Sequence, residues 1–265
     1  MALNIVLSDT VTAIPPQATG FVLVTGSHGG RIACYLAAKA GARAAIFNDA
    51  GRGLDDAGVA GLSDLDQIGV AAACVAHTSA RIADAADTFA SGIISEANVA
   101  ASGCGVTPGM SAQDAAAAFQ RHANRPTAQP HARHEGRVQL SPQVLGIDSI
   151  GLVAPGDAHK VLVIGSHGAL HGGKPESALS VEALFAVFHD AGVGKESVGI
   201  SRLPVLAARG IAAACVGFQS ARIGEARSLW ETGEISYANS VALALGVRAG
   251  HSVKASASHI IRMRT

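Results

Sequence analysis

Short apolar runs alternate with segments of helical spacing along the whole chain. The runs contain branched residues and stop at glycine or at a polar residue, which is typical of strands buried on both faces. We expect extended segments at 11–14, 21–25, 44–47 and 70–76. The intervening segments favour helices at 32–40, 62–68, 83–90 and 94–101. Strands that alternate with helices predict a mainly parallel sheet covered by helices.

The same pattern occurs twice along the chain. The peptide Gly-Ser-His-Gly stands at 26–29 and again at 165–168, a shift of 139 positions. The second copy then gains two residues, and at a shift of 141 the positions 46–109 contain 28 identities in 64. Chance gives a small fraction of that number, so we interpret the chain as a tandem duplication. In the second copy we expect extended segments at 150–153 and 160–164 and a helix at 176–185.

The duplication predicts the fold class and the domain boundaries. We expect an α/β protein built from two Rossmann-like βαβαβα units, with its halves related by a pseudo-twofold axis. The repeats span 1–120 and 138–265, and 121–137 joins them. This joining segment is rich in Pro, Arg and His and has no apolar periodicity, which favours an exposed linker. A metal-binding or RNA-binding tract is the alternative, although its histidines have no ligand-like register: His122, His131 and His134.

Composition narrows the class of protein. Hydrophobic residues make up 49% of the chain and charged residues 15%, which indicates a large core and excludes disorder. Lys+Arg and Asp+Glu balance at 20 each, so no net charge attracts nucleic acid or an anionic membrane surface. No apolar run approaches the roughly 20 residues of a membrane span, and the first residues do not have the pattern of a signal peptide. No CxxC pair occurs, so we expect buried thiols in a reduced, cytoplasmic protein at Cys34, Cys74, Cys104 and Cys215.

Polar residues shared by the two copies stand where strands are expected to end. In a parallel sheet, ligands bind beyond the carboxyl ends of the strands. These residues are Ser27, His28, Asp49, Ser79 and Arg81 in the first copy, and Ser166, His167, Asp190, Ser220 and Arg222 in the second. If the strands are adjacent, hydroxyl, imidazole, carboxylate and guanidinium groups converge on one ligand.

Such a set suits acid–base or nucleophilic chemistry on a small anion. Histidine transfers protons near neutral pH, a carboxylate can orient it, and serine can attack or polarise a carbonyl. Arginine presents a fork that matches carboxylate or phosphate. The catalytic candidates are His28, His167, Ser27, Ser166, Asp49 and Asp190. The substrate-binding candidates are Arg81, Arg222, Ser79, Ser220, Lys174, His171, Asn98 and Asn239.

Each candidate also has a structural interpretation. Gly-Ser-His-Gly can be a strand-to-helix turn with a serine cap, and it has neither the spacing of a nucleotide-binding glycine loop nor that of a nucleophile elbow. Asp-Ala-Gly, which contains Asp49 or Asp190, is an Asx-turn signature. The two arginines can pair with the acidic residue three positions on, Asp84 or Glu225. Ser95–Asn98 and Ser236–Asn239 are expected on one helical face, where capping or hydrogen bonds between the lobes are the alternative to ligand binding.

Differences between the copies can decide which half is active. His77 corresponds to Phe218, Asn48 to His189 and Met110 to His251. The second copy also contains ALHGGKPE, whose His171, Lys174 and Glu176 have no clear counterparts. This glycine-flanked segment suits a lid, and a plain loop is the alternative. We expect no cofactor and no metal, although a metal site stays open at His167, His171 and His189.

Two functions fit these observations. The first is an enzyme that acts on a small carboxylate-bearing metabolite, by amide or ester hydrolysis or, nearly as well, as a hydro-lyase or isomerase. The second is a noncatalytic anion-binding or accessory subunit. A pure scaffold fits less well, because it needs the core but not the repeated histidine and arginine. Alanine-rich helices also make a homo-oligomer plausible.

Overall fold

A computed structural model describes residues 4–16 and 20–264 of the chain. These residues divide into two compact units. The first contains the described residues up to Arg52, with Asp56–His134 and Gly194–Glu196. The second contains Gly53–Asp55, Glu135–Val193 and the described residues from Ser197 onward.

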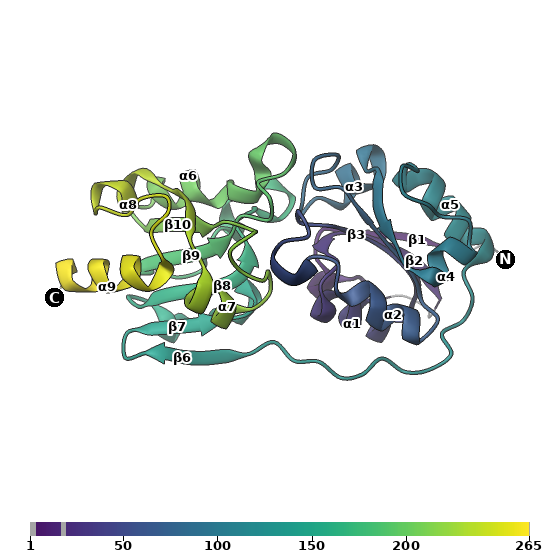
Figure 1. Ribbon diagram of the computed structural model, residues 1–265, viewed down its shortest axis with the longest axis horizontal. Helices are drawn as coiled ribbons and strands as arrows, with labels where there is room; N and C mark the ends of the chain where they lie inside the picture. The colour runs from purple at the N-terminus through teal and green to yellow at the C-terminus, as the bar shows by residue number, and fades with distance from the viewer. Residues whose placement is uncertain (1–3, 17–19, 265) are drawn as a thin grey trace. The chain divides into compact units, whose positions relative to one another are not determined.

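The first half of the chain alternates strands and helices as its sequence predicts (Figure 1). Its elements are β1 (Ile5–Ser8), η1 (Val11–Ala13), β2 (Phe21–His28), α1 (Arg31–Lys39), β3 (Ala42–Asn48), η2 (Leu54–Asp56), α2 (Gly61–Gln67), β4 (Ala71–Val75), α3 (Ala85–Ser91), β5 (Ile94–Ala97), α4 (Val99–Gly103) and α5 (Ala112–His122). The strands form a sheet of order β1-β2-β3-β4-β5, parallel except for β5, which runs antiparallel to β4.

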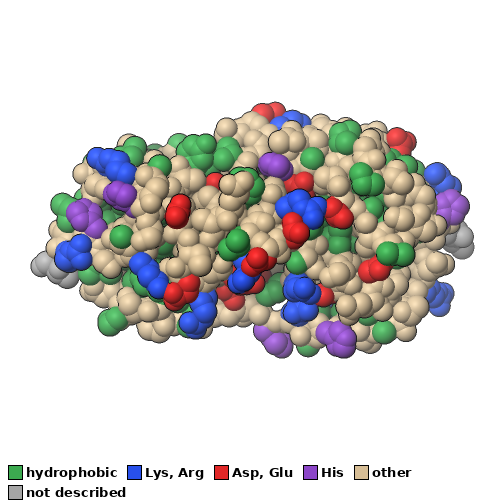
Figure 2. Space-filling view, viewed as in Figure 1, with side chains coloured by type: hydrophobic (Ala, Val, Ile, Leu, Met, Phe, Trp, Pro, Cys, Tyr) green, Lys and Arg blue, Asp and Glu red, His purple; other side chains and the backbone are tan. Residues whose placement is uncertain are grey.

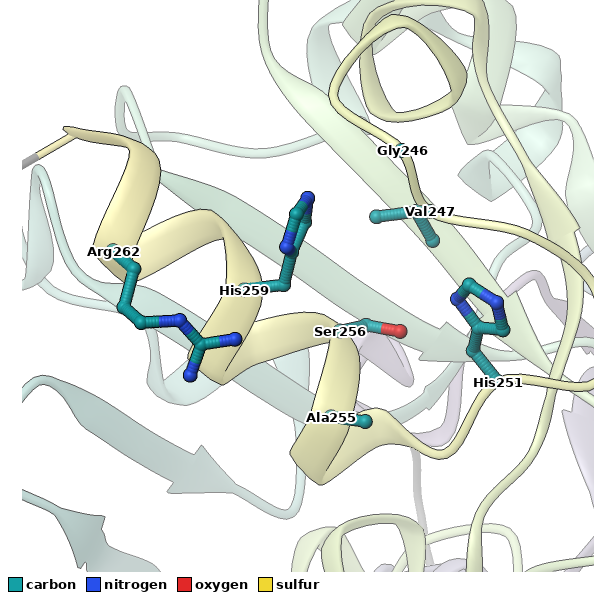
Figure 3. A pocket seen from close by; sticks show the side chains of 7 residues that line it. All are labelled: Gly246, Val247, His251, Ala255, Ser256, His259 and Arg262. Carbon is teal, nitrogen blue, oxygen red and sulfur yellow. The ribbon is translucent and has the colours of Figure 1, made fainter.

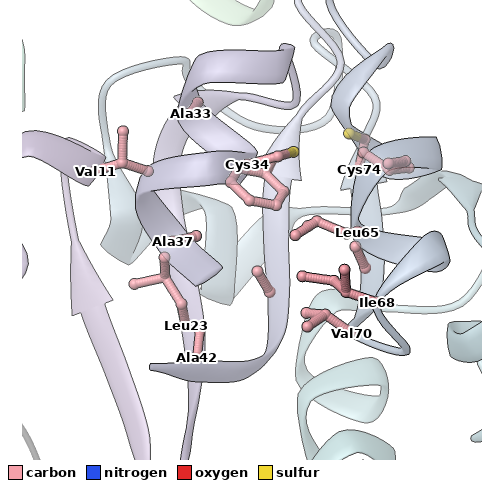
Figure 4. Close-up of a cluster of buried hydrophobic side chains, with 14 of the residues drawn as sticks. Val11, Leu23, Ala33, Cys34, Ala37, Ala42, Leu65, Ile68, Val70 and Cys74 are labelled. Atoms are coloured by element: carbon pink, nitrogen blue, oxygen red, sulfur yellow. The ribbon is translucent and has the colours of Figure 1, made fainter. Parts of the chain in front are cut away.

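Alternation along these strands builds the two apolar layers of the unit. In β2, Leu23 lies on the same side of the sheet as α1 and α2, whereas Val22 and Val24 lie on the side of α3 and α5. The layer on the α1 and α2 side is drawn in Figure 4, where Cys34 of α1 and Cys74 of β4 lie among aliphatic side chains. The side chains of both cysteines are fully buried. Small residues on the strands let the helices pack close to the sheet, so many of the alanines contribute to the packed core.

The second half repeats this plan with additions. Its elements are β6 (Arg137–Ser141), β7 (Val144–Ile147), η3 (Ile150–Leu152), η4 (Pro155–Asp157), β8 (Val161–His167), η5 (His171–Gly173), η6 (Pro175–Ser177), β9 (Phe185–His189), η7 (Lys195–Ile200), α6 (Arg202–Ala208), β10 (Ala212–Val216), α7 (Ala226–Thr232), β11 (Ile235–Ala238), α8 (Ser240–Ala244) and α9 (Val253–Arg264). The sheet order is β11-β10-β9-β8-β7-β6, with antiparallel pairs at its two edges. The predicted α/β fold in two similar halves, each with a mainly parallel sheet, is confirmed.

Three expectations about single elements are wrong. The first is the extended segment at 11–14, with its counterpart at 150–153, because these residues form the 3-10 helices η1 and η3. The strands that open the sheets are β1 and β7, which lie before these segments in the chain. The backbone N–H of Val11 donates to the Ser27 hydroxyl at 3.0 Å. In a strand this N–H would instead have donated to a carbonyl of the neighbouring strand.

The second is the helix at 94–101. Residues Ile94–Ala97 form β5, an edge strand antiparallel to β4, and α4 begins only after Asn98, whose side chain accepts from the N–H of Ala101. Ser95 therefore lies on a strand and Asn98 at a helix N-cap, not on one helical face. A short apolar run does not distinguish a strand from a helix by spacing alone.

The third is the helix at 176–185 in the second copy. After η6 this segment has no regular structure until β9 begins at Phe185. Its carbonyl oxygens accept hydrogen bonds from two arginines instead of forming a helical ladder. Arg202 donates to Ser177 and Ala178, and Arg209 donates to Leu179 and Val181. The first copy has Gly61 and Ile68 at the two arginine positions, and there the helix α1 covers the sheet.

None of the helices in the described part of the chain has the length and apolar character needed to cross a bilayer. On the face drawn in Figure 2, basic side chains lie next to acidic ones. The four cysteines are buried and free, as the sequence predicts, and burial raises the pKa of the Cys34, Cys74 and Cys215 thiols well above the usual range.

Candidate functional site

The Gly-Ser-His part of the repeated peptide forms the carboxyl end of a strand in both halves. Its glycines are required because other parts of the chain approach them closely. A Cβ on Gly26 would lie 2.3 Å from the backbone nitrogen of Asp84, and one on Gly29 would lie 2.5 Å from Cys74 Sγ. The second copy is packed in the same way, with 2.6 Å between a Cβ on Gly168 and Cys215 Sγ. The space beside these glycines is thus filled by the protein itself.

Both serines of this peptide bind the backbone. The Ser27 hydroxyl accepts from the N–H of Val11 at 3.0 Å, and the Ser166 hydroxyl accepts from the N–H of Ile150 at 2.9 Å. Each serine thereby fixes the start of a 3-10 helix that precedes its strand in sequence. This contact supports the structural interpretation of both residues.

The two histidines of the peptide share one local contact. The Nδ1 atom of His28 accepts from the N–H of Gly30 at 3.1 Å, and that of His167 accepts from the N–H of Ala169 at 3.3 Å. Burial lowers the pKa of His28 to about 4, so its imidazole is neutral at neutral pH. The ring of His167 meets the ring of His171 edge-on, with 5.8 Å between the centroids. A histidine that protonates only near pH 4 is poorly matched to proton transfer at neutral pH.

Asp49 forms the centre of a hydrogen-bonded cluster that joins three strand ends. It follows β3, and its Oδ1 atom accepts from Nδ1 of His77 at 2.9 Å and from the backbone N–H of His77 at 2.9 Å. Its Oδ2 atom accepts from the hydroxyl of Ser95 on β5 at 2.8 Å. His77 follows β4, which pairs in parallel with β3. Because the carboxyl ends of parallel neighbouring strands meet at one edge of the sheet, Asp49 and His77 lie close together. We call Asp49, His77 and Ser95 the Asp–His–Ser cluster.

The cluster holds its carboxylate ionised. Asp49 is 5% exposed, and burial by itself raises its pKa. The hydrogen bonds from His77, Gly51 and Ser95 outweigh burial, and the net effect is a pKa below the usual value. A buried carboxylate that stays charged and holds an imidazole nitrogen is an orienting group for that histidine.

The loop that carries Asp49 has a strained backbone. The N–H of Gly51 donates to Asp49 Oδ1 at 2.9 Å, which is the Asx-turn that the sequence indicates. The next residues have positive φ: 50° at Ala50, 73° at Gly51 and 64° at Arg52. The left-handed region is unfavourable for Ala and Arg, and such conformations persist where the surroundings enforce them.

The second half has the same loop but not the same cluster. Asp190 accepts from the N–H of Gly192 at 3.0 Å and from the N–H of Phe218 at 3.0 Å. Phe218 stands at the position of His77, so this half lacks the imidazole that Asp49 binds. Ser236 donates to the carbonyl of Cys215 at 3.2 Å. The difference between His77 and Phe218 was visible in the sequence, but His77 was not selected there as the partner of Asp49.

Asn48 and His189, another pair that differs between the copies, have equivalent structural roles. The side chain of Asn48 accepts from the N–H of Ala50 at 2.9 Å and donates to the carbonyl of Ala80 at 3.1 Å. His189 makes the corresponding contacts with Ala191 at 3.0 Å and Ala221 at 3.1 Å. The residue type changed while the two backbone contacts were kept.

Asn98 and Asn239 are buried, and their side chains bind backbone groups. Asn98 accepts from the N–H groups of Ala72 and Ala101, and it donates to the carbonyls of Leu62 at 3.2 Å and Val70 at 2.9 Å. Asn239 makes the same four contacts in the second half. These side chains connect β4 or β10 with the helix on either side, which supports the structural interpretation.

Ser79 and Ser220 also bind the backbone. Ser79 donates to Ala76 at 2.8 Å and accepts from Ile93 at 2.9 Å. Ser220 donates to Gly217 at 2.8 Å and accepts from Glu234 at 3.0 Å. Ser79 therefore stabilises the loop that follows β4, and Ser220 stabilises the loop that follows β10.

Both candidate arginines form ion pairs. Arg81 lies 3.0 Å from Asp84, 3.4 Å from Asp87 and 3.1 Å from Glu196. Arg222 lies 2.7 Å from Asp55 and 3.3 Å from Glu225. The structural interpretation, in which each arginine pairs with the acidic residue three positions on, is thus confirmed in both halves.

Lys174 and His171 lie in the irregular segment that replaces α1. Lys174 precedes η6, and its backbone carbonyl accepts from the hydroxyl of Ser177 at 2.6 Å. The backbone N–H of His171 donates to the same hydroxyl at 2.9 Å. Across the described residues, no three His, Cys, Asp or Glu side chains are grouped so that they could hold a metal ion.

No model of a known protein family matches this chain, and no curated protein or solved structure matches it significantly.

Proposed function

We propose that this protein is an enzyme of small-molecule chemistry in which His77 transfers protons and Asp49 orients it. The proposal places the activity in the first half of the chain. It keeps the acid–base chemistry expected from the sequence and moves it from His28 to His77. Hydrolysis of an amide or ester in a small carboxylate-bearing molecule is the reaction that we propose.

The observation that carries the proposal is the 2.9 Å contact between Asp49 Oδ1 and His77 Nδ1. A carboxylate that binds Nδ1 fixes the proton on that nitrogen and the orientation of the ring. Nε2 is then the nitrogen that exchanges protons with a reacting group. The side chain of His77 is 24% exposed and that of Asp49 is 7% exposed, so the base is accessible and its orienting group is buried.

Water is the nucleophile that fits this arrangement. The serine hydroxyls offered as nucleophiles, Ser27 and Ser166, accept from backbone N–H groups. Ser95 donates to the orienting carboxylate itself. In our proposal a water molecule attacks the carbonyl carbon and its proton passes to Nε2 of His77. His77 then returns this proton to the amine or alcohol, which leaves as the C–N or C–O bond of the substrate breaks.

Arg81 is our proposed group for the substrate carboxylate. It lies in the same loop as His77, after β4. Its pair with Glu196 is partly exposed, with the Arg81 side chain 31% and the Glu196 side chain 59% accessible. Exposed pairs of this kind contribute about 0 to 1 kcal/mol, so a substrate carboxylate can replace Glu196 at little cost.

The alternative is a noncatalytic protein that binds a small anion. The duplicated serine and asparagine side chains bind the backbone in both halves, so they support neither a second catalytic site nor a ligand contact of their own. A protein of this kind is stabilised by its ligand and does not convert it.

Activity against a panel of amides and esters of small carboxylic acids tests the proposal. We expect hydrolysis of at least one compound by the wild-type chain. His77→Phe, which installs the second copy's residue, should lower that rate by about 10²- to 10⁴-fold. His131→Ala, in the exposed linker, is the matched histidine control and should leave the rate unchanged. A rate that survives His77→Phe would contradict the proposal, and binding without conversion would favour the alternative.

A further inference from the structure

A pocket of about 340 Å³ lies in the second half, between the loop after α8 and one side of α9 (Figure 3). Its polar lining consists of His251 in the loop and of Ser256, His259 and Arg262 on α9. The three helix residues are spaced by three positions, which places them along one side of the helix. The volume is at the lower end of the roughly 300 to 1,000 Å³ that is usual for small-molecule sites.

The lining is basic and contains no acidic residue. Arg262 supplies a permanent positive charge, and the two imidazoles supply ring nitrogens. The Nε2 atom of His259 lies 2.9 Å from the carbonyl of Leu245, which orients the ring. Val247 and Ala255 add an apolar surface. A small molecule that carries an oxyanion and a short apolar part matches this lining.

Ser256 is an independent sign of a ligand. It is 2% exposed, and its Oγ atom has no hydrogen-bond partner among the described residues. Figure 3 shows this hydroxyl directed into the pocket, toward the His251 ring. A buried hydroxyl without a partner destabilises the folded state, and a bound oxyanion would accept a hydrogen bond from it.

The first copy has the same backbone here but a different lining. An isolated bridge ties Glu234 to Ser252 ahead of α9, and the matching bridge ties Ile93 to Ser111 ahead of α5. At the shift of 141 positions, the first-copy residues are Met110 for His251, Ala115 for Ser256 and Ala118 for His259. Both alanines are buried in the apolar core of the first unit. His251, Ser256 and His259 are therefore specific to the second copy, whereas Arg262 corresponds to Arg121 in the first.

Gly246 shows that His259 is accommodated by the surrounding backbone. This glycine has a φ of +85°, and a Cβ there would lie 3.0 Å from His259 Nε2. Its counterpart Gly105 has a φ of +84° and no atom within 4 Å of the corresponding position. The space beside this turn is thus open at Gly105 in the first copy and is occupied by the His259 imidazole at Gly246 in the second.

We infer that this pocket binds a small organic oxyanion, a carboxylate or a phosphate, between Arg262, His259 and the Ser256 hydroxyl. The site lies apart from the Asp–His–Ser cluster in the chain and uses none of its residues. It gives the second half, which has Phe218 where His77 stands in the first, a binding role of its own.

Calorimetric titration of the full chain with inorganic phosphate and, separately, with butyrate tests this inference and distinguishes the two oxyanions. We expect binding of at least one probe at concentrations up to about 10 mM. Arg262→Gln should weaken it about tenfold or more, because a hydrogen bond to a charged group is lost. His259→Ala and Ser256→Ala, which install the first copy's residues, should each weaken binding by a few-fold, about 3 to 10.

Arg121→Gln is the matched control, since Arg121 is the first copy's counterpart of Arg262 and should not affect binding. His77→Phe should also leave binding unchanged, so that failure here is distinguishable from failure of the proposed activity. Far-ultraviolet circular dichroism confirms that each variant is folded. Absence of binding for both probes, or binding that Arg262→Gln and His259→Ala leave intact, would overturn the inference.

Discussion

Replacement of Asp49 by asparagine removes the charge of the Asp–His–Ser cluster while preserving its shape. Asparagine keeps an oxygen that can accept from Gly51 and from the backbone of His77. It loses the negative charge opposite the His77 ring, and its amide nitrogen cannot accept from the Ser95 hydroxyl. The wild-type contacts that change are therefore the ring bond of 2.9 Å and the hydroxyl bond of 2.8 Å.

The size of the effect follows from these two bonds. Hydrogen bonds to a charged group contribute about 1.5 to 3 kcal/mol and neutral ones about 0.5 to 1.5 kcal/mol, so each weakened bond costs about 1 kcal/mol. Burial of a neutral amide is easier than burial of a carboxylate, which opposes this loss. The pKa of Asp49 is nevertheless lowered, so the native state favours the charged form. We therefore expect Asp49→Asn to lower the free energy of unfolding of its unit by about 2 kcal/mol at pH 7.

The same reasoning fixes the dependence on pH. A carboxyl group with a lowered pKa in the folded state adds stability that is fully present above its unfolded pKa, near 3.8. That stability is lost as the pH falls through the lower pKa of the folded state. The variant has no such titration, so the difference in stability between wild type and variant should shrink as the pH is lowered through this window.

Urea unfolding of wild type, Asp49→Asn, His77→Phe and the double variant measures the coupling. We expect the two single effects to be non-additive by about 1 kcal/mol, since both remove the same ring contact. Asp190→Asn is the control, because Phe218 offers its carboxylate no ring N–H, and it should cost less than Asp49→Asn. Additivity within about 0.5 kcal/mol, or an equal cost in both halves, would refute this account of the cluster.

Three further predictions concern the rest of the fold. Asn98→Ala and Asn239→Ala should each lower the free energy of unfolding by about 3 kcal/mol or more in urea titrations, because each leaves several buried backbone groups unpaired; a loss under about 1 kcal/mol would contradict their bracing role. Gly26→Ala should lower stability by about 2 kcal/mol or more through its close approach to Asp84, whereas Gly103→Ala, with open space around it, should be neutral or stabilising, and thermal unfolding distinguishes the two. The thiols of Cys34, Cys74 and Cys215 should react slowly with Ellman's reagent in the native protein and rapidly in urea, since burial raises their pKa, and fast native labelling would show that they are accessible.

The architecture was predictable because the short apolar runs indicate the strands and the internal repeat indicates the two halves. The strands at 21–25, 44–47 and 70–76 are found as β2, β3 and β4, with their ends moved by up to three residues. The internal repeat then assigned the second half by alignment. The segment at 176–185 could not be predicted in this way. Its carbonyls accept hydrogen bonds from Arg202 at the start of α6 and from Arg209 just after its end, in place of a helix that the composition of the segment allows.

The candidate site was only partly predictable for a related reason. Strand order brings the ends of β3 and β4 together, and Asp49 lies there as expected. Whether a polar side chain meets a ligand or its own backbone depends on tertiary contacts that spacing does not encode. Ser27 and Asn98 bind the backbone. His77, two residues after the end of β4, binds the Asp49 carboxylate instead. The signal for His77 was its loss in the second copy, and the signal for the α9 pocket was a similar difference at Met110 and His251.

The claim that Asp49 and His77 act as one catalytic unit is tested most directly by a kinetic cycle on whichever panel compound the wild-type chain hydrolyses. The measurement is kcat/KM for wild type, Asp49→Asn, His77→Phe and the double variant. Because groups that act as a unit are not additive, we expect both single variants to be strongly impaired and the double variant to be no slower than His77→Phe. Hydrolysis that Asp49→Asn leaves unchanged, or losses that multiply in the double variant, would contradict the account.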